Sequence, residues 1–187
     1  MMESKIANPG ALGLLGFGMT TVLLNLHNAG VIELTITVAA MGLALGGLAQ
    51  IIAGIMEFKN GNTFGATAFT AYGLFWWSLV IIWANPGGAF SAADNVSLGY
   101  YLLLWGIFTL FMAIGTLKHN RATQVVFFSL AILFFLLAAG HFAGNNTVIV
   151  IAGIVGIICG LSAIYNSLAQ VVNGEYGHKV LPLGRDK

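Results

Sequence analysis

Six long apolar runs occupy most of this 187-residue chain, and they leave little room for any other kind of fold. Each run is about 20 residues long, the length that an α-helix needs to cross the roughly 30 Å hydrocarbon core of a bilayer. The runs are continuously apolar and lack the alternation of barrel strands, so helices are predicted rather than a β-barrel. The predicted spans are 9–28, 36–58, 66–84, 97–118, 123–141 and 147–173. We therefore predict an all-α membrane protein, a bundle of six transmembrane helices in a single domain over residues 1–187.

The basic residues fall only in alternate connections between these runs. They are Lys5, Lys59, Lys118, Arg121, Lys179, Arg185 and Lys187, and the other three connections contain none. Connections rich in Lys and Arg are retained on the cytoplasmic side during insertion. We therefore expect both termini to be cytoplasmic, the odd-numbered spans to run outward, and the protein to be a multi-pass protein of the plasma (inner) membrane.

The composition argues against most other classes of function. Only 7% of the residues are charged, compared with about 25% in a typical soluble domain. The net charge of +1 offers no basic surface for nucleic acid, so no nucleic-acid partner is expected. Cys159 is the only cysteine, and the chain contains neither an HExxH motif nor a nucleophile elbow. We predict no catalytic residue, no cofactor and no metal, and an intramembrane enzyme is the least favoured class.

Polar side chains within the spans are few and mostly neutral. In lipid such groups must face protein or water, so they indicate where a solute path could run. A path lined by neutral hydroxyl and amide groups binds a small polar solute weakly enough to release it. The candidate path residues from this inventory are Thr20, Asn25, Gln50, Glu57 and Thr67.

Two ionisable residues each allow two interpretations. Glu57, near the inner end of the second span, is either a proton-sensitive carboxylate at the inner mouth or a structural group paired with Lys59 or the turn that follows. His27, at the outer end of the first span, is either a sensor of external pH or a hydrogen-bonded structural histidine. The structural interpretation is favoured for both.

Three bulky residues are predicted to share one depth in the membrane. Phe17, Tyr72 and Leu130 lie about six to eight residues into the first, third and fifth spans, all of which start at the inner face. At a rise of 1.5 Å per residue they lie at nearly the same height. If the odd spans line a central path, these side chains form a hydrophobic constriction, which gates by excluding water. Packing in the bundle or against lipid is the alternative for any one of them.

Small residues also recur at intervals of four. Gly42 and Gly46 make one such step, and Ala152, Gly156 and Gly160 make two. These stripes allow close approach of helices, either within one protomer or between protomers.

Several short motifs, rich in Gly, Asn and Thr, recur near the ends of the spans and within them. The first is Asn8-Pro9-Gly10-Ala11-Leu12-Gly13-Leu14, continued by Gly16-Phe17-Gly18-Met19-Thr20-Thr21 and Asn25-Leu26-His27-Asn28. Further matches include Gln50-Ile51-Ile52-Ala53-Gly54, Phe127-Phe128-Ser129-Leu130 and Cys159-Gly160-Leu161-Ser162-Ala163. Together these motifs closely resemble those of the acetate uptake transporter family, the succinate–acetate permease group. One departure is that Gly10-Ala11 stands where the family usually has Ala-Pro, which puts the geometry of the helix entrance in question.

The resemblance implies transport of acetate, and in some members succinate, as a proton-coupled transporter or an anion channel. It implies a homohexamer whose protomers each contain a pore narrowed by a Phe–Leu–Tyr constriction, matched here by Phe17, Leu130 and Tyr72. It also implies that Leu130 and Ala163 influence substrate selectivity. The expected partners are a small carboxylate substrate and the lipid bilayer.

Other functions remain open. A channel for another small solute such as formate, urea or ammonia is the closest alternative, and a structural or signalling membrane protein is a further one. A charged carboxylate in a dry constriction costs several kcal/mol or more, so passage is expected to be easier for the protonated acid.

Overall fold

The computed structural model describes residues 7–88 and 90–184. Three of the basic residues used to predict the topology, Lys5, Arg185 and Lys187, lie outside the described residues. The spans are formed by α1 (Pro9–Asn28); by α2 (Ile36–Met41), η1 (Gly42–Ala49) and α3 (Gln50–Lys59) in succession; by α4 (Thr63–Ala84); by α5 (Asn95–Gly115) with η3 (Thr116–Lys118); by α6 (Arg121–Ala143); and by α7 (Asn146–Tyr176). Six helical segments of the described chain are long and apolar enough to cross a membrane, which confirms the prediction of a six-helix bundle.

A polar residue caps the start of every span. In each case its side chain accepts a hydrogen bond from a backbone N–H of the first turn, and the caps are Asn8, Thr35, Asn62, Asp94, Asn120 and Asn145. These bonds satisfy N–H groups that have no partner within the helix. At the start of α5, the bond from the Ser97 N–H lowers the pKa of the Asp94 carboxyl. At the start of α1, Asn8 and Pro9 produce a regular helix even though the second proline of the family motif is missing.

The second span differs from the uniform helix expected from its hydropathy. Residues Gly42–Ala49 are π-helical, so this span is locally wider than an α-helix. The Trp77 indole donates a hydrogen bond of 3.0 Å to the Leu43 carbonyl within this segment. The Leu45 carbonyl lies so close to Gly16 that a Cβ there would come within 2.5 Å of the oxygen. The π-helical turns therefore direct carbonyl groups toward α1 and α4.

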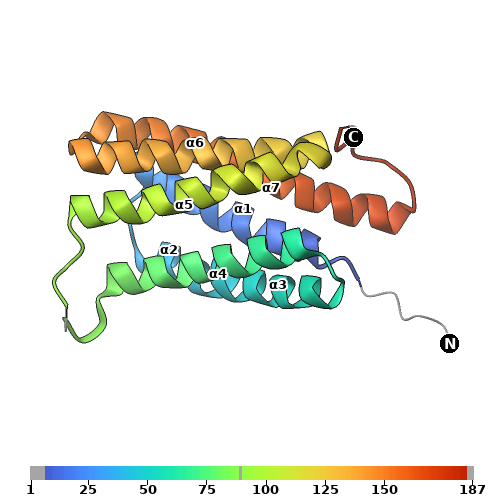
Figure 1. Ribbon diagram of the computed structural model, residues 1–187, viewed down its shortest axis with the longest axis horizontal. Helices are drawn as coiled ribbons and strands as arrows, with labels where there is room; N and C mark the ends of the chain where they lie inside the picture. Colours follow the sequence, from blue (N-terminus) through green and yellow to red (C-terminus); the bar gives the residue numbers. More distant parts are fainter. Residues whose placement is uncertain (1–6, 89, 185–187) are drawn as a thin grey trace.

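The helices lie along one long axis, and α1 runs through the middle of the bundle (Figure 1). It packs against α7 on one side and against η1 and α3 on the other, while α6 packs against both α5 and α7. Helices α4 and α5 meet mainly through side chains, including the stacked rings of Phe75 and Tyr101. This arrangement encloses a central space between α1, α4 and α6.

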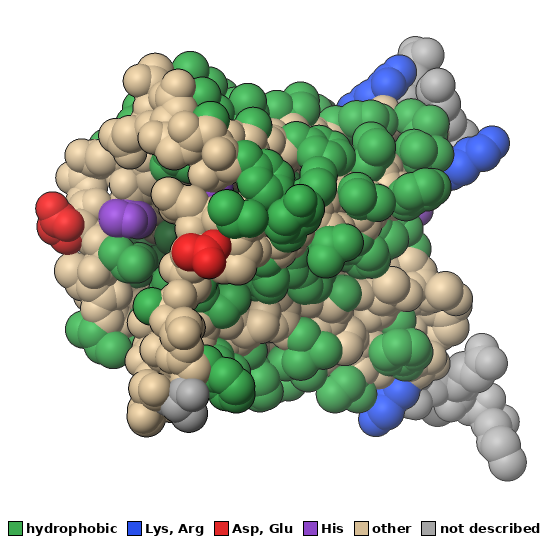
Figure 2. Space-filling view, turned by 60° about the vertical axis from the view of Figure 1, so that its left-hand side comes forward, with side chains coloured by type: hydrophobic (Ala, Val, Ile, Leu, Met, Phe, Trp, Pro, Cys, Tyr) green, Lys and Arg blue, Asp and Glu red, His purple; other side chains and the backbone are tan. Residues whose placement is uncertain are grey.

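Charged groups lie at the two ends of the bundle, and a broad apolar band covers the middle (Figure 2). Lys and Arg side chains gather at one end, while the acidic groups visible in this view lie at the other. Both ends of the described chain lie at the end with the basic residues (Figure 1). This agrees with the predicted topology, and we refer to the basic end as the inner end.

The predicted stripe of small residues on the last span lies in close contact with α1. A Cβ at Gly160 would lie 2.8 Å from the Gly18 carbonyl oxygen, and one at Gly18 would lie 2.8 Å from the Gly160 carbonyl oxygen. A Cβ at Gly156 would overlap the Asn25 side chain. The stripe therefore serves packing within the protomer, between α7 and α1, rather than contact between protomers.

We expect Gly160→Ala to destabilise the protein by about 1–3 kcal/mol, because the added methyl group meets backbone that cannot rotate away. Gly174→Ala on the same helix is the matched control, since the methyl group it adds meets no atom within 4 Å apart from its own turn of the helix. Thermal unfolding in detergent measures the difference. Equal melting temperatures for the two variants would contradict the close approach of α1 and α7.

Candidate functional site

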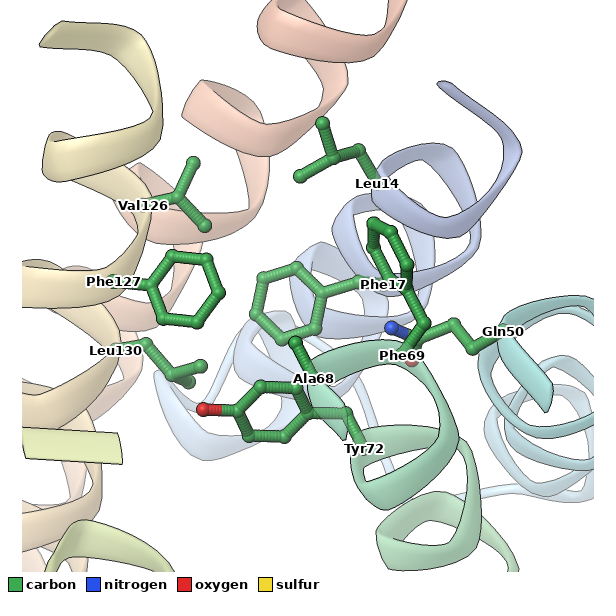
Figure 3. A pocket seen from close by; sticks show the side chains of 9 residues that line it. All are labelled: Leu14, Phe17, Gln50, Ala68, Phe69, Tyr72, Val126, Phe127 and Leu130. Atoms are coloured by element: carbon green, nitrogen blue, oxygen red, sulfur yellow. The ribbon is translucent and has the colours of Figure 1, made fainter. Parts of the chain in front are cut away.

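The three residues predicted to share one depth do so in the structure. Phe17 is the ninth residue of α1, while Tyr72 and Leu130 are the tenth residues of α4 and α6. All three helices start at the inner end, so the side chains project at one height along the bundle axis. Figure 3 shows them converging from the three helices, with the Phe17 ring beside Phe127 and above the Tyr72 ring. We call these three residues the inner neck.

The inner neck separates two small cavities. The inner cavity has a volume of about 20 Å³. Its lining residues are Leu14, Phe17, Gln50, Ala68, Phe69, Tyr72, Val126, Phe127 and Leu130. The central chamber, with a volume of about 30 Å³, is lined by Phe17, Thr21, Leu24, Asn25, Tyr72, Phe75, Trp76, Leu130, Leu133, Phe134 and Leu137. The residues common to both linings are Phe17, Tyr72 and Leu130.

Tightly packed aromatic rings make up most of the inner neck. The ring centroids of Phe17 and Tyr72 are 6.0 Å apart, and those of Tyr72 and Phe127 are 6.2 Å apart. Phe17, Tyr72 and Leu130 are 6%, 3% and 3% exposed, so little space remains between them. A neck of this kind excludes water unless its side chains move.

The hydroxyl of Tyr72 is directed toward α5, at the side of the inner neck. It forms a hydrogen bond of 2.9 Å with the Oγ1 of Thr109 on α5. Thr109 is fully buried, so each group supplies the other with a partner that lipid would not provide. Tyr72 therefore presents its ring to the path, and the bond to Thr109 fixes the position of that ring.

We expect Tyr72→Phe and Thr109→Val each to lower the free energy of unfolding by about 1 kcal/mol. Each change removes the hydrogen bond and leaves the remaining buried hydroxyl without a partner. The double variant should cost less than the sum of the two single changes. Thermal unfolding of the four proteins gives the coupling. Strictly additive losses would mean that the bond does not hold the tyrosine.

A second constriction lies further toward the outer end. The central chamber and a larger outer vestibule of about 210 Å³ have Leu24, Phe75 and Leu137 in common. Leu24 and Leu137 follow Phe17 and Leu130 by seven residues, two helical turns along the same faces. We call these residues the outer neck. The sequence prediction did not include it, although its seven-residue spacing from the inner neck was visible.

The other predicted path residues divide into two groups. Gln50 lines the inner cavity and Asn25 lines the central chamber. Thr20, Glu57, Thr67 and Ala163 line none of the three cavities. The Thr20 hydroxyl donates to the Gly16 carbonyl at 2.8 Å, and its side chain packs against Gly46 of η1.

Thr67, which was predicted to line the path, lies on the exposed face of α4. Thr67, Leu74 and Ile81 are spaced by seven residues and form an exposed stripe on the outside of α4. This stripe faces away from Tyr72, which is buried. Apolar residues occur on every side of α4, so its composition gave no indication of which face turns inward.

Ala163 is fully buried, and it lines neither the inner cavity nor the central chamber. It lies on α7, which packs along α6. An influence of this position on selectivity, as the family resemblance implies, would therefore have to pass through α1 or α6, the two helices against which α7 packs.

Glu57 is 5% exposed and accepts a hydrogen bond of 2.9 Å from the Asn62 amide. Asn62 also caps α4, so the carboxylate ties the end of α3 to the start of α4. Gly10 and Gly65 give the side chain its space. This geometry supports the structural interpretation of Glu57 rather than a place on the path.

His27 lines the outer vestibule together with His141 of α6. Its Nδ1 lies 3.2 Å from the Ile32 carbonyl, which fastens the loop after α1. The Nδ1 of His141 is 3.2 Å from Asn95 at the start of α5. Both rings are therefore hydrogen-bonded to neighbouring segments, which supports the structural interpretation of His27.

Comparison with known proteins places this geometry in a family. Residues 1–183 match the model of the GPR1/FUN34/yaaH family. The chain is 56% identical over 185 residues, 98% of each chain, to a succinate-acetate/proton symporter, SatP, of Escherichia coli (strain K12). It is 36% identical over 198 residues, 96% of this chain and 66% of the relative, to acetate permease A of Emericella nidulans. The solved structure of a bacterial acetate channel, SatP, superposes with a TM-score of 0.94 at 56% identity, covering 96% of this chain and all of the other.

Proposed function

Because the chain belongs to the GPR1/FUN34/yaaH family, we propose that it carries acetate and other small carboxylates across the plasma membrane through the centre of each protomer. Relatives bear the names symporter, permease and channel, and none of these is an enzyme. The intramembrane-enzyme alternative is therefore set aside. The observation that carries the proposal is the series of inner cavity, inner neck, central chamber, outer neck and outer vestibule between α1, α4 and α6.

The lining of this series suits a short carboxylic acid. The necks are apolar, and no Lys, Arg, Asp or Glu lines the inner cavity, the central chamber or the outer vestibule. A methyl group passes such walls at little cost, whereas an ionised carboxylate in a dry neck costs several kcal/mol or more. Protonation removes most of this cost. We therefore propose that acetic acid crosses the necks in its protonated form, which couples each passage to the movement of one proton.

The proposed cycle uses the side chains of this chain in three roles. Phe17, Tyr72 and Leu130 exclude water and restrict the width of the substrate. Gln50, whose Oε1 is buried without a partner, offers an acceptor to the acid proton in the inner cavity. The residues that line the outer vestibule, the largest of the three cavities, leave room for water, with which the acid exchanges its proton.

Uptake of radiolabelled acetate into proteoliposomes tests the function. We expect uptake well above that of protein-free vesicles, and competition by unlabelled acetate rather than by formate, urea or ammonia at equal concentration. Uptake equal to the protein-free background would refute acetate transport. Stronger competition by one of the other solutes would favour that solute as the substrate.

We also propose that the protein is a homohexamer, in which each protomer keeps its own path. Exposed apolar side chains on α4 and α5, such as Leu74, Leu104 and Phe111, provide surface for neighbours within the bilayer. Native mass spectrometry from detergent gives the number of chains directly. A monomer under mild detergent conditions would contradict this part of the proposal.

A further inference from the structure

The π-helical segment of the second span, Gly42–Ala49, is eight residues long. π-Helical turns are rare, and most of them occur singly within α-helices, often at functional sites. This segment contains no proline that would force the backbone out of the α-helical form. Contacts with the neighbouring helices must therefore hold it in the wider form.

Trp77 on α4 supplies one of these contacts. Its indole N–H donates a hydrogen bond of 3.0 Å to the Leu43 carbonyl. In an α-helix this carbonyl would accept from the N–H of the residue four positions on, which is Gly47. The indole lies directly over Gly47 and would overlap any Cβ there. The indole therefore offers the carbonyl a donor in place of the α-helical N–H, an insertion of the kind that distorts helices.

Two other carbonyl groups of the segment lie against the helices that carry the aromatic residues of the inner neck. A Cβ at Gly16 of α1 would come within 2.5 Å of the Leu45 carbonyl oxygen. A Cβ at Gly73 of α4 would lie 2.8 Å from the Gly47 carbonyl oxygen. These two glycines are the immediate neighbours, along the chain, of the phenylalanine and the tyrosine of the inner neck. The π-helical segment therefore supports both rings through the backbone that carries them.

Trp77 itself lies away from the path. It is half-buried and lines none of the three cavities. Thr70, Gly73 and Trp77 contact the second span and are spaced by three and four residues, so they form one face of α4. The neighbouring Tyr72 side chain lines the inner cavity instead. Any influence of Trp77 on a solute in these cavities therefore passes through the packing of the helices.

We propose that Trp77 is a positioning residue that determines substrate width: its indole holds Gly42–Ala49 in the π-helical form, and this form fixes the spacing of Phe17 and Tyr72. The proposal rests on the proposed transport function and adds to it a determinant of specificity outside the path. A π-helical hydrogen bond spans one more residue than an α-helical one. Return of one turn to the α-helical form would therefore rotate the residues that follow by about 100°. The two carbonyl groups would then withdraw from α1 and α4, and the rings could separate.

Trp77→Phe tests the proposal, because it keeps a ring over Gly47 and removes the N–H. We expect it to raise the ratio of butyrate flux to acetate flux in proteoliposomes by about three- to fivefold, in line with the loss of one hydrogen bond. Gly47→Ala disturbs the same contact from the second span, since the added carbon overlaps the indole. It should change the ratio in the same direction. Uptake into protein-free vesicles is subtracted for both acids.

Tyr165→Phe is the matched control. It also removes a hydrogen bond from an aromatic side chain to a backbone carbonyl, that of Pro182, at 2.7 Å, and Tyr165 lines none of the three cavities. This variant should keep the wild-type ratio, even if its melting temperature falls as far as that of Trp77→Phe. Hydrogen–deuterium exchange of peptides covering residues 42–50 is a second readout. It should be faster in Trp77→Phe than in the wild-type protein and unchanged in Tyr165→Phe.

The outcomes separate this proposal from the proposed function. If the wild-type protein carries no acetate, the transport function fails, and the proposed control of substrate width fails with it. If it carries acetate and Trp77→Phe leaves the ratio unchanged or lowers it, transport stands and the positioning role is refuted. Unchanged hydrogen exchange in residues 42–50 would refute the hold of the indole on the segment. If Trp77→Phe does not fold, Gly47→Ala against Tyr165→Phe decides in the same way.

Discussion

Leu130→Ala is expected to increase the flux of butyrate relative to acetate by about tenfold, because it opens the inner neck on the α6 side. Leu130 is 3% exposed and contributes to both cavities, so shortening it joins them. A wider neck admits longer alkyl groups and also holds water more readily. The measurement is uptake of a series of monocarboxylates of increasing length into proteoliposomes at one pH.

Leu136→Ala is the control for this change. Leu136 lies on the same helix and packs against the core, but it lines none of the three cavities. It should lose stability without a change in the ratio of butyrate to acetate flux. If the two variants have the same ratio as the wild-type protein, Leu130 does not limit the width of the path.

Acetate flux at constant total acetate is expected to fall about tenfold for each unit of pH above 6, because the protonated fraction of a simple carboxylic acid falls by this factor well above its pKa. The reason lies in the neck, where an additional barrier of about 1.4 kcal/mol for the anion already lowers its rate of passage tenfold. The cost of an unpaired carboxylate in an apolar site is larger than this.

The diffusion of acetic acid through lipid has the same pH dependence, so uptake into protein-free vesicles must be subtracted at every pH. The protein-dependent flux should carry no net electrical current, because the acid is neutral. A protein-dependent flux that stays constant between pH 6 and 8 and produces a current would show that the anion itself passes. The proposed passage of the protonated acid would then be wrong.

Hydropathy and charge were sufficient to predict the fold. Continuous apolar runs give the six helices, and Lys59, Lys118 and Arg121 give the direction in which they run. Depth followed from counting residues along each helix, since the rise per residue is constant. Counting residues therefore predicts one height for Phe17, Tyr72 and Leu130, and the cavities that they separate agree with this prediction.

Rotation of each helix about its own axis could not be predicted. A membrane helix that is apolar on all sides has no polar face to mark its outside, and this is why Thr67 was assigned to the path although it lies on the outer stripe of α4. For the same reason the contact of Thr109 with Tyr72 could not be predicted, because this hydrogen bond depends on how α4 and α5 face each other. The π-helical turns at Gly42–Ala49 depend on carbonyl contacts with α1 and α4, which no local sequence pattern records.

The central claim is that acetate passes between Phe17, Tyr72 and Leu130, and a reversible block at this point tests it most directly. Cys159 is the only cysteine, so Leu130→Cys in a Cys159→Ala background carries a single thiol at the inner neck. The same protein sample is measured before and after treatment with a small methanethiosulfonate, with mass spectrometry to verify modification, and again after reduction. Leu136→Cys in the same background is the control. We predict that modification at position 130 reduces acetate flux at least severalfold and that reduction restores it, with no change at position 136. Unchanged flux through protein fully modified at position 130 would contradict the account.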